Sequence, residues 1–137
     1  MTATNKPPIW FWIIAVIALI WNAMGVNAYL QQAYNTESYR AMYTKEQIEI
    51  ASNLPAYVTA AFAIAVFAGA LAALLLVFRK KLATTLFYLS LLGVLVQMGY
   101  LLVNGYMSDM IMTILIIVFA IFLAWFGKFS LSRHYIS

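Results

Sequence analysis

The chain has 137 residues, of which 66% are hydrophobic and only 9% are charged. Soluble domains carry about 25% charged residues, so this composition excludes a water-facing globular surface and indicates an integral membrane protein. Cysteine is absent, which excludes disulfides, thiolate metal sites and cysteine nucleophiles. The net charge of +4 does not indicate nucleic-acid binding, because the basic residues lie where the topology of a membrane protein requires them.

Four apolar segments follow one another along the chain, at residues 9–30, 55–78, 82–103 and 110–127. Each has about 18–24 residues, and about 20 helical residues cross a hydrocarbon core of about 30 Å. Helix is required because lipid offers no partner to open backbone groups. The sequence therefore predicts one all-α domain, residues 1–137, that forms an integral membrane four-helix bundle. We expect the first segment to be a span and not a cleaved signal peptide, because its apolar run is long and rich in aromatic residues.

Charged residues divide between the two ends of the predicted bundle. Six of the eight basic residues lie at the end that holds both termini, namely Lys6, Arg79, Lys80, Lys81, Lys128 and Arg133. The other end holds the remaining two basic residues and every acidic residue, which are Arg40, Lys45, Glu37, Glu46, Glu49 and Asp109. The positive-inside rule predicts that both termini are cytoplasmic. The triplet 79–81 is then a topology signal that also contacts anionic lipid headgroups.

The connection at residues 31–54 is the longest polar segment and is expected to be a structured outer loop. Thr44 and Gln47 have the spacing of a capping box, which predicts a short helix that starts after Thr44. This helix should end near Asn53, because Pro55 disfavours helix in the residue before it. Tyrosines surround the region, as is typical of a membrane interface.

Small side chains recur every four residues in the second segment, at Ala61, Ala65, Gly69 and Ala73. This spacing places them on one helix face, where another helix can approach closely. The sequence does not decide whether that helix belongs to the same chain or to another subunit.

Carboxamide and phenol groups interrupt the first and third segments. Helical spacing places Gln97 on a face with Tyr100 and Asn104, and Asn22 on a face with Tyr29, while Asn27 lies on a neighbouring face. Counted from the same end of the bundle, Asn22 and Gln97 differ by about 3 Å in depth at 1.5 Å rise per residue. Six residues therefore form a candidate polar cluster in the outer half of the bundle: Asn22, Asn27, Tyr29, Gln97, Tyr100 and Asn104. Hydroxyls nearer the termini, at Thr84, Thr85 and Ser90, are expected to bond their own helix backbones.

Two interpretations of this cluster remain open. In the first, carboxamides bond across helices and fasten the bundle, and the protein is a non-enzymatic assembly or accessory subunit that binds a copy of itself or another membrane protein. In the second, the cluster lines a pocket that is open to the outer side and binds a small neutral, sugar-like solute, as in a permease or sensor.

Several kinds of chemistry find no support in the sequence. No Asp, Glu, Lys, Arg or His lies inside a predicted span, and proton-coupled pumps usually need such a group. The single histidine, His134, is expected to be a solvated residue of the C-terminal tail. Because no metal-ligand spacing, phosphate-binding loop or nucleophile–base pair is present, we expect no metal, no cofactor and no enzymatic activity.

Three stretches carry a resemblance to a known family. They are Pro7-Pro8 with Trp10–Trp12 and Trp21–Gly25, then Leu54-Pro55 with the alanine-rich segment and Arg79–Lys81, and finally Leu89–Gln97. Together they resemble small bacterial four-span inner-membrane proteins that are often labelled as sugar transporters. The resemblance implies a bacterial inner-membrane location and assigns no functional residue.

Overall fold

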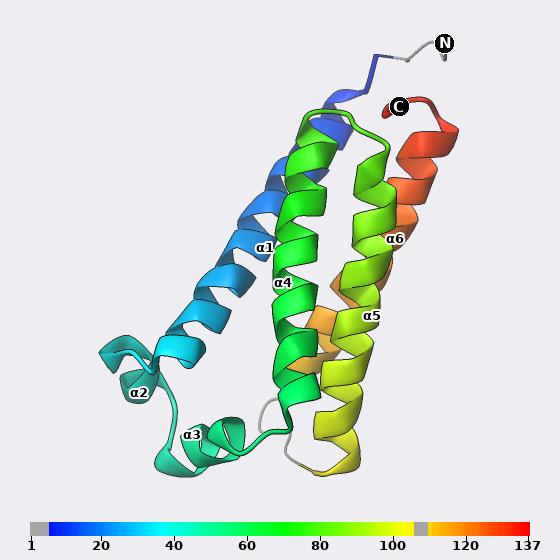
Figure 1. The fold of residues 1–137 in the computed structure, drawn as a ribbon. Coiled ribbons are helices and arrows are strands. Elements are labelled where there is room, and N and C mark those ends of the chain that lie inside the picture. Colours follow the sequence, from blue (N-terminus) through cyan, green and yellow to red (C-terminus); the bar gives the residue numbers. More distant parts are fainter. Residues whose placement is uncertain (1–5, 106–109) are drawn as a thin grey trace.

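The computed structural model describes residues 6–105 and 110–137, and every regular element in these two ranges is an α-helix. Four helices are long and two are short. The long helices are α1 (Ile9–Tyr34), α4 (Ala56–Val77), α5 (Leu82–Val103) and α6 (Met110–Ser132), and the short ones are α2 (Glu37–Met42) and α3 (Lys45–Ser52). Figure 1 shows the long helices side by side, with α2 and α3 at one end, here called the loop end, and the described chain ends at the other, here called the termini end. The predicted all-α four-helix bundle is confirmed. Asp109, expected among the acidic residues of the loop end, lies outside the described residues.

The four long helices have the length and hydropathy of membrane spans. The two shortest have 22 residues, which gives about 33 Å at 1.5 Å per residue, enough to cross a hydrocarbon core of about 30 Å. The chain is therefore a multi-pass membrane protein. Helix α1 continues past the predicted boundary at residue 30, because its backbone remains paired until Asn35 takes a left-handed conformation at φ 50°. Helix α6 likewise continues past residue 127 to Ser132.

The outer connection is structured, and its local sequence explains why. Thr44 accepts a hydrogen bond from the Gln47 N–H at 3.1 Å, and the Gln47 side chain accepts one from the Thr44 N–H at 3.0 Å. The predicted capping box is thus present, and α3 ends at Ser52, before Asn53. Helix α2 has a cap of the same kind, since the Thr36 hydroxyl accepts a hydrogen bond from the Tyr39 N–H at 3.2 Å.

The small-residue face of α4 packs against helices of the same chain. Ala61, Ala65, Gly69 and Ala73 are all buried. At Gly93 of α5, an added Cβ would lie 2.7 Å from the Ala61 carbonyl oxygen, so the backbones of α4 and α5 are in close approach. The absence of a side chain at Gly69 leaves room for Asn22 of α1 and Ser90 of α5, both of which an added Cβ would meet. The partners of this face, which the sequence could not decide, are therefore α5 and α1.

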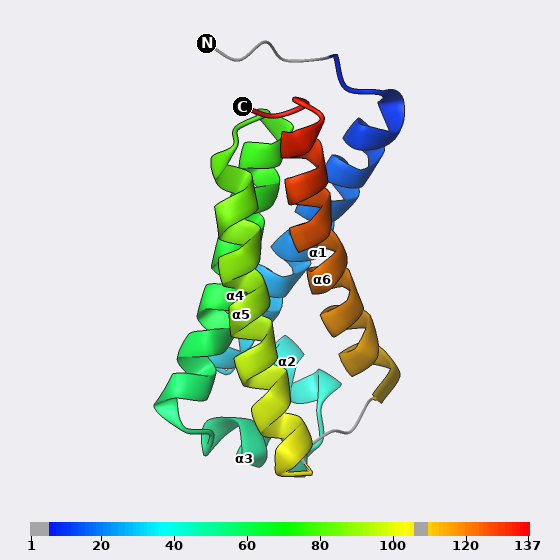
Figure 2. The same cartoon turned by 90° about the vertical axis from the view of Figure 1, so that its right-hand side faces the viewer.

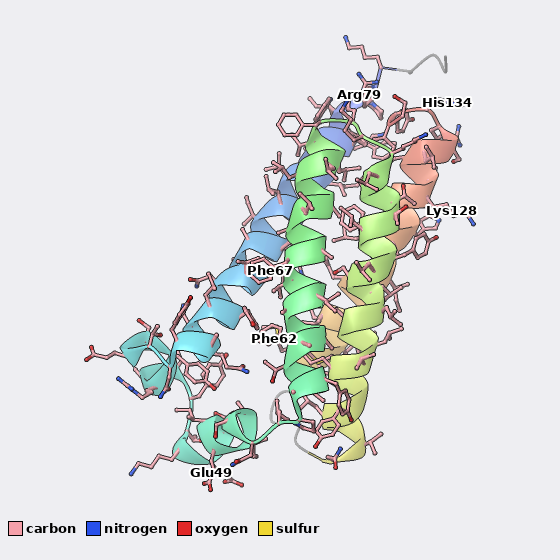
Figure 3. All side chains as sticks on the ribbon, in the orientation of Figure 1. Glu49, Phe62, Phe67, Arg79, Lys128 and His134 are labelled. Atoms are coloured by element: carbon pink, nitrogen blue, oxygen red, sulfur yellow. The ribbon has the colours of Figure 1, made fainter. Side chains whose placement is uncertain are left out.

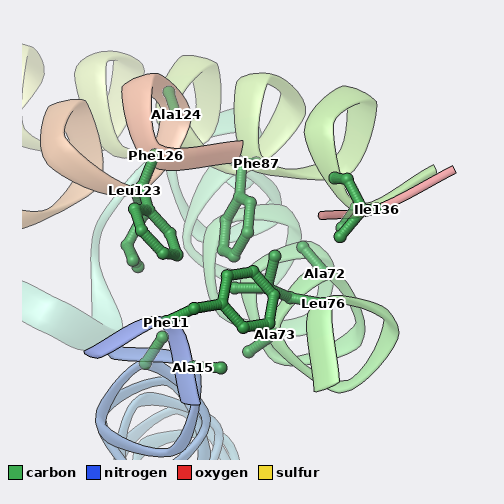
Figure 4. Close-up of a cluster of buried hydrophobic side chains, with 12 residues drawn as sticks. Phe11, Ala15, Ala72, Ala73, Leu76, Phe87, Leu123, Ala124, Phe126 and Ile136 are labelled. Carbon is green, nitrogen blue, oxygen red and sulfur yellow. The ribbon is translucent and has the colours of Figure 1, made fainter. Parts of the chain in front are cut away.

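The termini end of the bundle is filled by a continuous apolar core (Figure 4). Phe11, Leu76, Phe87 and Phe126 are at most 2% exposed and come from four different helices. The Phe11 and Phe126 rings lie 5.7 Å apart between centroids. The core takes its remaining members from the same helices and from the tail: Ala15, Ala18, Ala72, Ala73, Ala83, Leu123, Ala124 and Ile136.

The chain after α6 folds back onto this core. Ile136 is fully buried, and the Ser137 N–H donates to the Arg79 carbonyl oxygen at 3.1 Å. The Lys81 N–H donates in return to the Ser137 carbonyl oxygen at 3.0 Å, and the Arg79 Nε–H donates to the Tyr135 carbonyl oxygen at 2.8 Å. His134 is exposed, as expected, but the segment around it is not a free tail, and Arg79 has a structural role that the sequence did not indicate.

Charged side chains lie at both ends of the bundle. In Figure 3, Glu49 lies at the loop end, whereas Arg79, Lys128 and His134 lie at the termini end. Figure 2 shows the same separation of α2 and α3 from the two termini in a view turned by 90°.

We expect Gly93→Ala to destabilise the bundle. The new Cβ would meet backbone atoms of α4, 2.7 Å from the Ala61 oxygen and 2.9 Å from the Ala65 nitrogen, so the two helices would have to separate, at about 1–3 kcal/mol. The matched control is Gly99→Ala on the same helix, where an added Cβ meets nothing within 4 Å. This control is expected to be neutral or to stabilise by up to about 1 kcal/mol, because alanine favours helix. Thermal unfolding in mild detergent measures both, and equal melting temperatures would contradict the close approach of α4 and α5.

Candidate functional site

A cavity of about 490 Å³ lies between the four long helices, on the loop-end side of the apolar core. Its volume falls within the range of about 300–1,000 Å³ that is typical of small-molecule sites. In Figures 1 and 2, α1 leans away from α4 toward α2, and the loop ends of α1 and α6 lie apart.

The cavity brings together part of the predicted polar cluster. Asn22 and Asn27 from α1 line it together with Gln97 from α5, so amide side chains of separate helices do meet in one space. Further polar residues that the predicted cluster did not contain line the same cavity, namely Gln31, Gln32, Tyr39, Tyr43 and Ser90. Ser90 lies seven residues before Gln97 on the same helix face, and this spacing could have revealed it.

The other half of the predicted cluster does not line the cavity. The Tyr29 ring packs edge-on against Phe62, with centroids 5.3 Å apart, and against Phe67 at 5.6 Å. The Tyr100 ring packs against Tyr57 at 6.0 Å. The Asn104 amide is exposed and donates to its own helix, at the Tyr100 carbonyl oxygen. These three residues therefore lie outside the candidate site.

Two hydrogen bonds between helices come from hydroxyl groups of α5. The Ser90 hydroxyl donates to the Ala65 carbonyl oxygen of α4 at 2.6 Å, and the Thr84 hydroxyl donates to the Gly127 carbonyl oxygen of α6 at 3.1 Å. The expectation that Ser90 and Thr84 bond their own helices is therefore wrong. Both side chains face a closely packed neighbouring helix, whose carbonyl oxygen lies within reach of a short hydroxyl.

Two carboxamides that line the cavity, those of Asn22 and Gln97, do not bond to a neighbouring helix in the described part of the chain. The Asn22 amide donates to the Ala18 carbonyl oxygen of its own helix at 2.8 Å, and its side chain lies against Gly69. Within residues 6–105 and 110–137, Gln97 makes no hydrogen bond. An amide that can donate and accept, and that faces a cavity, is available to a ligand.

Helix α2 and Tyr43, the residue that caps its C-terminus, stand at the mouth of the cavity. Tyr39 is buried there, while Met42 and Tyr43 are exposed, and all three line the cavity. Burial raises the pKa of the Tyr39 phenol, and the neighbouring Tyr43 phenol raises it further, so Tyr39 stays neutral at physiological pH. The short helix thus presents uncharged polar groups to anything that enters from the loop end.

The floor of the cavity is closed toward the termini end. Phe87 and Leu123 line the cavity and are also members of the apolar core behind it. Among the described residues, none that lines the cavity is charged, and no group of three or more acidic, histidine or cysteine side chains is placed to hold a metal. The site is therefore a one-sided, uncharged pocket.

Comparisons of the chain with models of protein families, with curated proteins and with solved structures find no match.

We expect Gln97→Leu to leave the bundle as stable as the original or slightly more stable, because no hydrogen bond to the described residues is lost and leucine has a similar volume. The matched variant on the same helix is Ser90→Ala, which removes the 2.6 Å bond to α4 and should cost roughly 0.6–1.7 kcal/mol. Unfolding in detergent compares the two. A larger loss of stability for Gln97→Leu than for Ser90→Ala would show that the glutamine fastens the helices.

Proposed function

We propose that this protein is a non-enzymatic membrane protein that binds a small neutral molecule in the pocket between its spans. The observation that carries the proposal is that hydroxyl and amide side chains make different contacts. Hydroxyls join the helices, whereas the amides of Asn22 and Gln97, from different helices, face one cavity. Interhelical fastening therefore does not explain why these amides are present.

The chemistry of the lining favours an uncharged ligand. A charged ligand in a pocket surrounded by membrane needs a counter-charge, and the described lining offers none. Carboxamides donate and accept hydrogen bonds at once, which suits hydroxyl, carbonyl or amide groups on the ligand.

Assembly with a second copy or with another membrane protein is the alternative role. The small-residue face of α4 could have served such assembly, since faces of this kind mediate close helix contacts and the sequence left its partner undecided. That face is occupied within the chain by Gly93 of α5 and by Asn22 of α1. Ligand binding is therefore the better-supported proposal.

We further propose a bacterial inner-membrane location with both termini in the cytoplasm. The termini end carries Lys6, Lys80 and Lys128 among its basic residues, as the positive-inside rule requires, and the resemblance to bacterial inner-membrane proteins agrees. In this orientation the pocket opens to the outer side and the apolar core closes it toward the cytoplasm. Binding or sensing requires no second conformation of the protein. A permease would also require a conformation in which the apolar core and the folded-back tail separate and open the pocket to the cytoplasm.

Single-cysteine labelling tests the orientation, and the natural chain has no cysteine to interfere. Ser38 on α2 and Ser132 at the end of α6 are both exposed. We expect an impermeant maleimide to label Ser38→Cys in intact cells, and to label Ser132→Cys only after the inner membrane is opened. The reverse pattern would place the termini outside.

The same approach tests the pocket itself. We expect a small hydrophilic thiol reagent, added from the outer side, to modify Gln97→Cys, because this position lines the cavity. Ala73→Cys is the buried control, since Ala73 is fully buried in the apolar core and should stay unmodified. An unreactive Gln97→Cys, or one that reacts equally fast from the cytoplasmic side, would contradict a pocket open to the outside.

A further inference from the structure

The walls of the pocket are mostly apolar, and this limits what it can hold. Methionines line it from four helices, at Met24 of α1, Met42 of α2, Met98 of α5 and Met112 of α6. Methionine side chains are flexible and polarisable, and they are common at surfaces that adapt to varied apolar ligands. A sugar carries hydroxyls on all sides, and each one that lacks a partner in an apolar wall weakens binding.

Aromatic rings form part of the same walls. Trp21 of α1 stacks on Phe119 of α6, with ring centroids 4.9 Å apart, and both residues line the cavity. Polar groups line the same cavity from α1, at Asn22 and Asn27, and from α5, at Ser90 and Gln97. The pocket thus offers both apolar surface and hydrogen-bonding groups to the same ligand.

The pocket is bordered by α1 and α6, whose backbones are not closely packed on each other. Helix α1 packs on α4, and α6 packs on α5, while the Trp21 and Phe119 rings bridge α1 and α6. Met24 is 62% exposed and Met112 is 46% exposed, and both line the cavity. Both helices have the length and hydropathy of membrane spans, and Figure 2 shows their loop ends apart.

We propose that the ligand is a neutral amphiphile, with an apolar chain or ring system and a hydroxyl or carbonyl group, that enters from the outer leaflet between α1 and α6. This inference rests on the proposed function and specifies its ligand. The apolar part lies along the methionines and the Trp21–Phe119 pair, and the polar group bonds to Gln97. An apolar chain gains little by leaving lipid for an equally apolar pocket, so selectivity comes from the hydrogen bond to the amide.

The test uses the intrinsic tryptophan fluorescence of the chain in lipid nanodiscs, with Trp21→Phe to identify the contribution of Trp21 among the four tryptophans. The probe is a monoacylglycerol with a dibrominated chain, because bromine quenches tryptophan on contact. We expect quenching that saturates with the mole fraction of the probe and that unbrominated monoacylglycerol relieves. The saturable part should be absent in Trp21→Phe, and Gln97→Leu should weaken the apparent affinity about threefold, the value of one hydrogen bond in a membrane.

A matched pair of variants on α1 controls for quenching from the surrounding bilayer. Ala28 lines the pocket and Ala23 does not, and both are exposed, so a larger side chain fits at either position without entering the core. We expect Ala28→Phe to fill the mouth and to abolish saturation, and Ala23→Phe to retain it. Non-saturating quenching that is equal in both variants would overturn the inference.

Two further probes separate this inference from the proposed function. Saturable quenching of equal affinity by a dibrominated fatty acid would overturn the requirement for a neutral ligand. A free hexose that raises the melting temperature of the original chain but not that of Gln97→Leu, without saturable quenching by the monoacylglycerol, would overturn the amphiphile and leave the proposed function standing. If neither probe binds and Gln97→Cys is unreactive from outside, both proposals fail.

Discussion

The hydrocarbon core of a bilayer offers no hydrogen-bond partner, and this constraint acts on the polar groups that the chain places inside the membrane. The backbone satisfies it by forming helices, and α1, α4, α5 and α6 are each long enough to cross. A hydroxyl or amide side chain can bond to its own helix, bond to a neighbour or face a cavity, whereas the Ser130 hydroxyl is buried without a partner among the described residues. The structure uses all three, because Asn22 bonds its own helix, Ser90 bonds α4, and Gln97 faces the cavity.

Side-chain packing closes one end of the bundle and not the other. Alanines and glycines bring α4 and α5 together, with Gly93 in near contact with the Ala61 carbonyl oxygen. At the termini end, large rings such as Phe11 and Phe126 fill the space between α1 and α6, and Ile136 of the folded-back tail completes the filling. Toward the loop end, the side chains that line the space, among them Gly25 and Ala28 of α1, leave the cavity.

The distribution of polar groups gives the cavity its chemical character. Short hydroxyls reach the carbonyl oxygens of neighbouring helices at 2.6–3.1 Å, and the helices are joined without the longer amides. Amides and phenols then line the space, together with methionines and the Trp21–Phe119 pair. The described lining of the pocket is therefore uncharged and mixes apolar with hydrogen-bonding side chains.

The sequence by itself determined the four spans, the helix that follows the Thr44–Gln47 capping box, and the small-residue face of α4. These features depend on local composition and helical periodicity, which a linear chain displays directly. It also placed Asn22 and Gln97 at similar depth, but depth and helix face do not say which neighbour a side chain meets. Only the tertiary structure decided that Ser90 bonds across helices, that Tyr29, Tyr100 and Asn104 lie outside the pocket, and that the tail after α6 seals one end. Each of those outcomes depends on the tilt and rotation of one helix against another, and these are set by packing contacts between residues far apart in the chain.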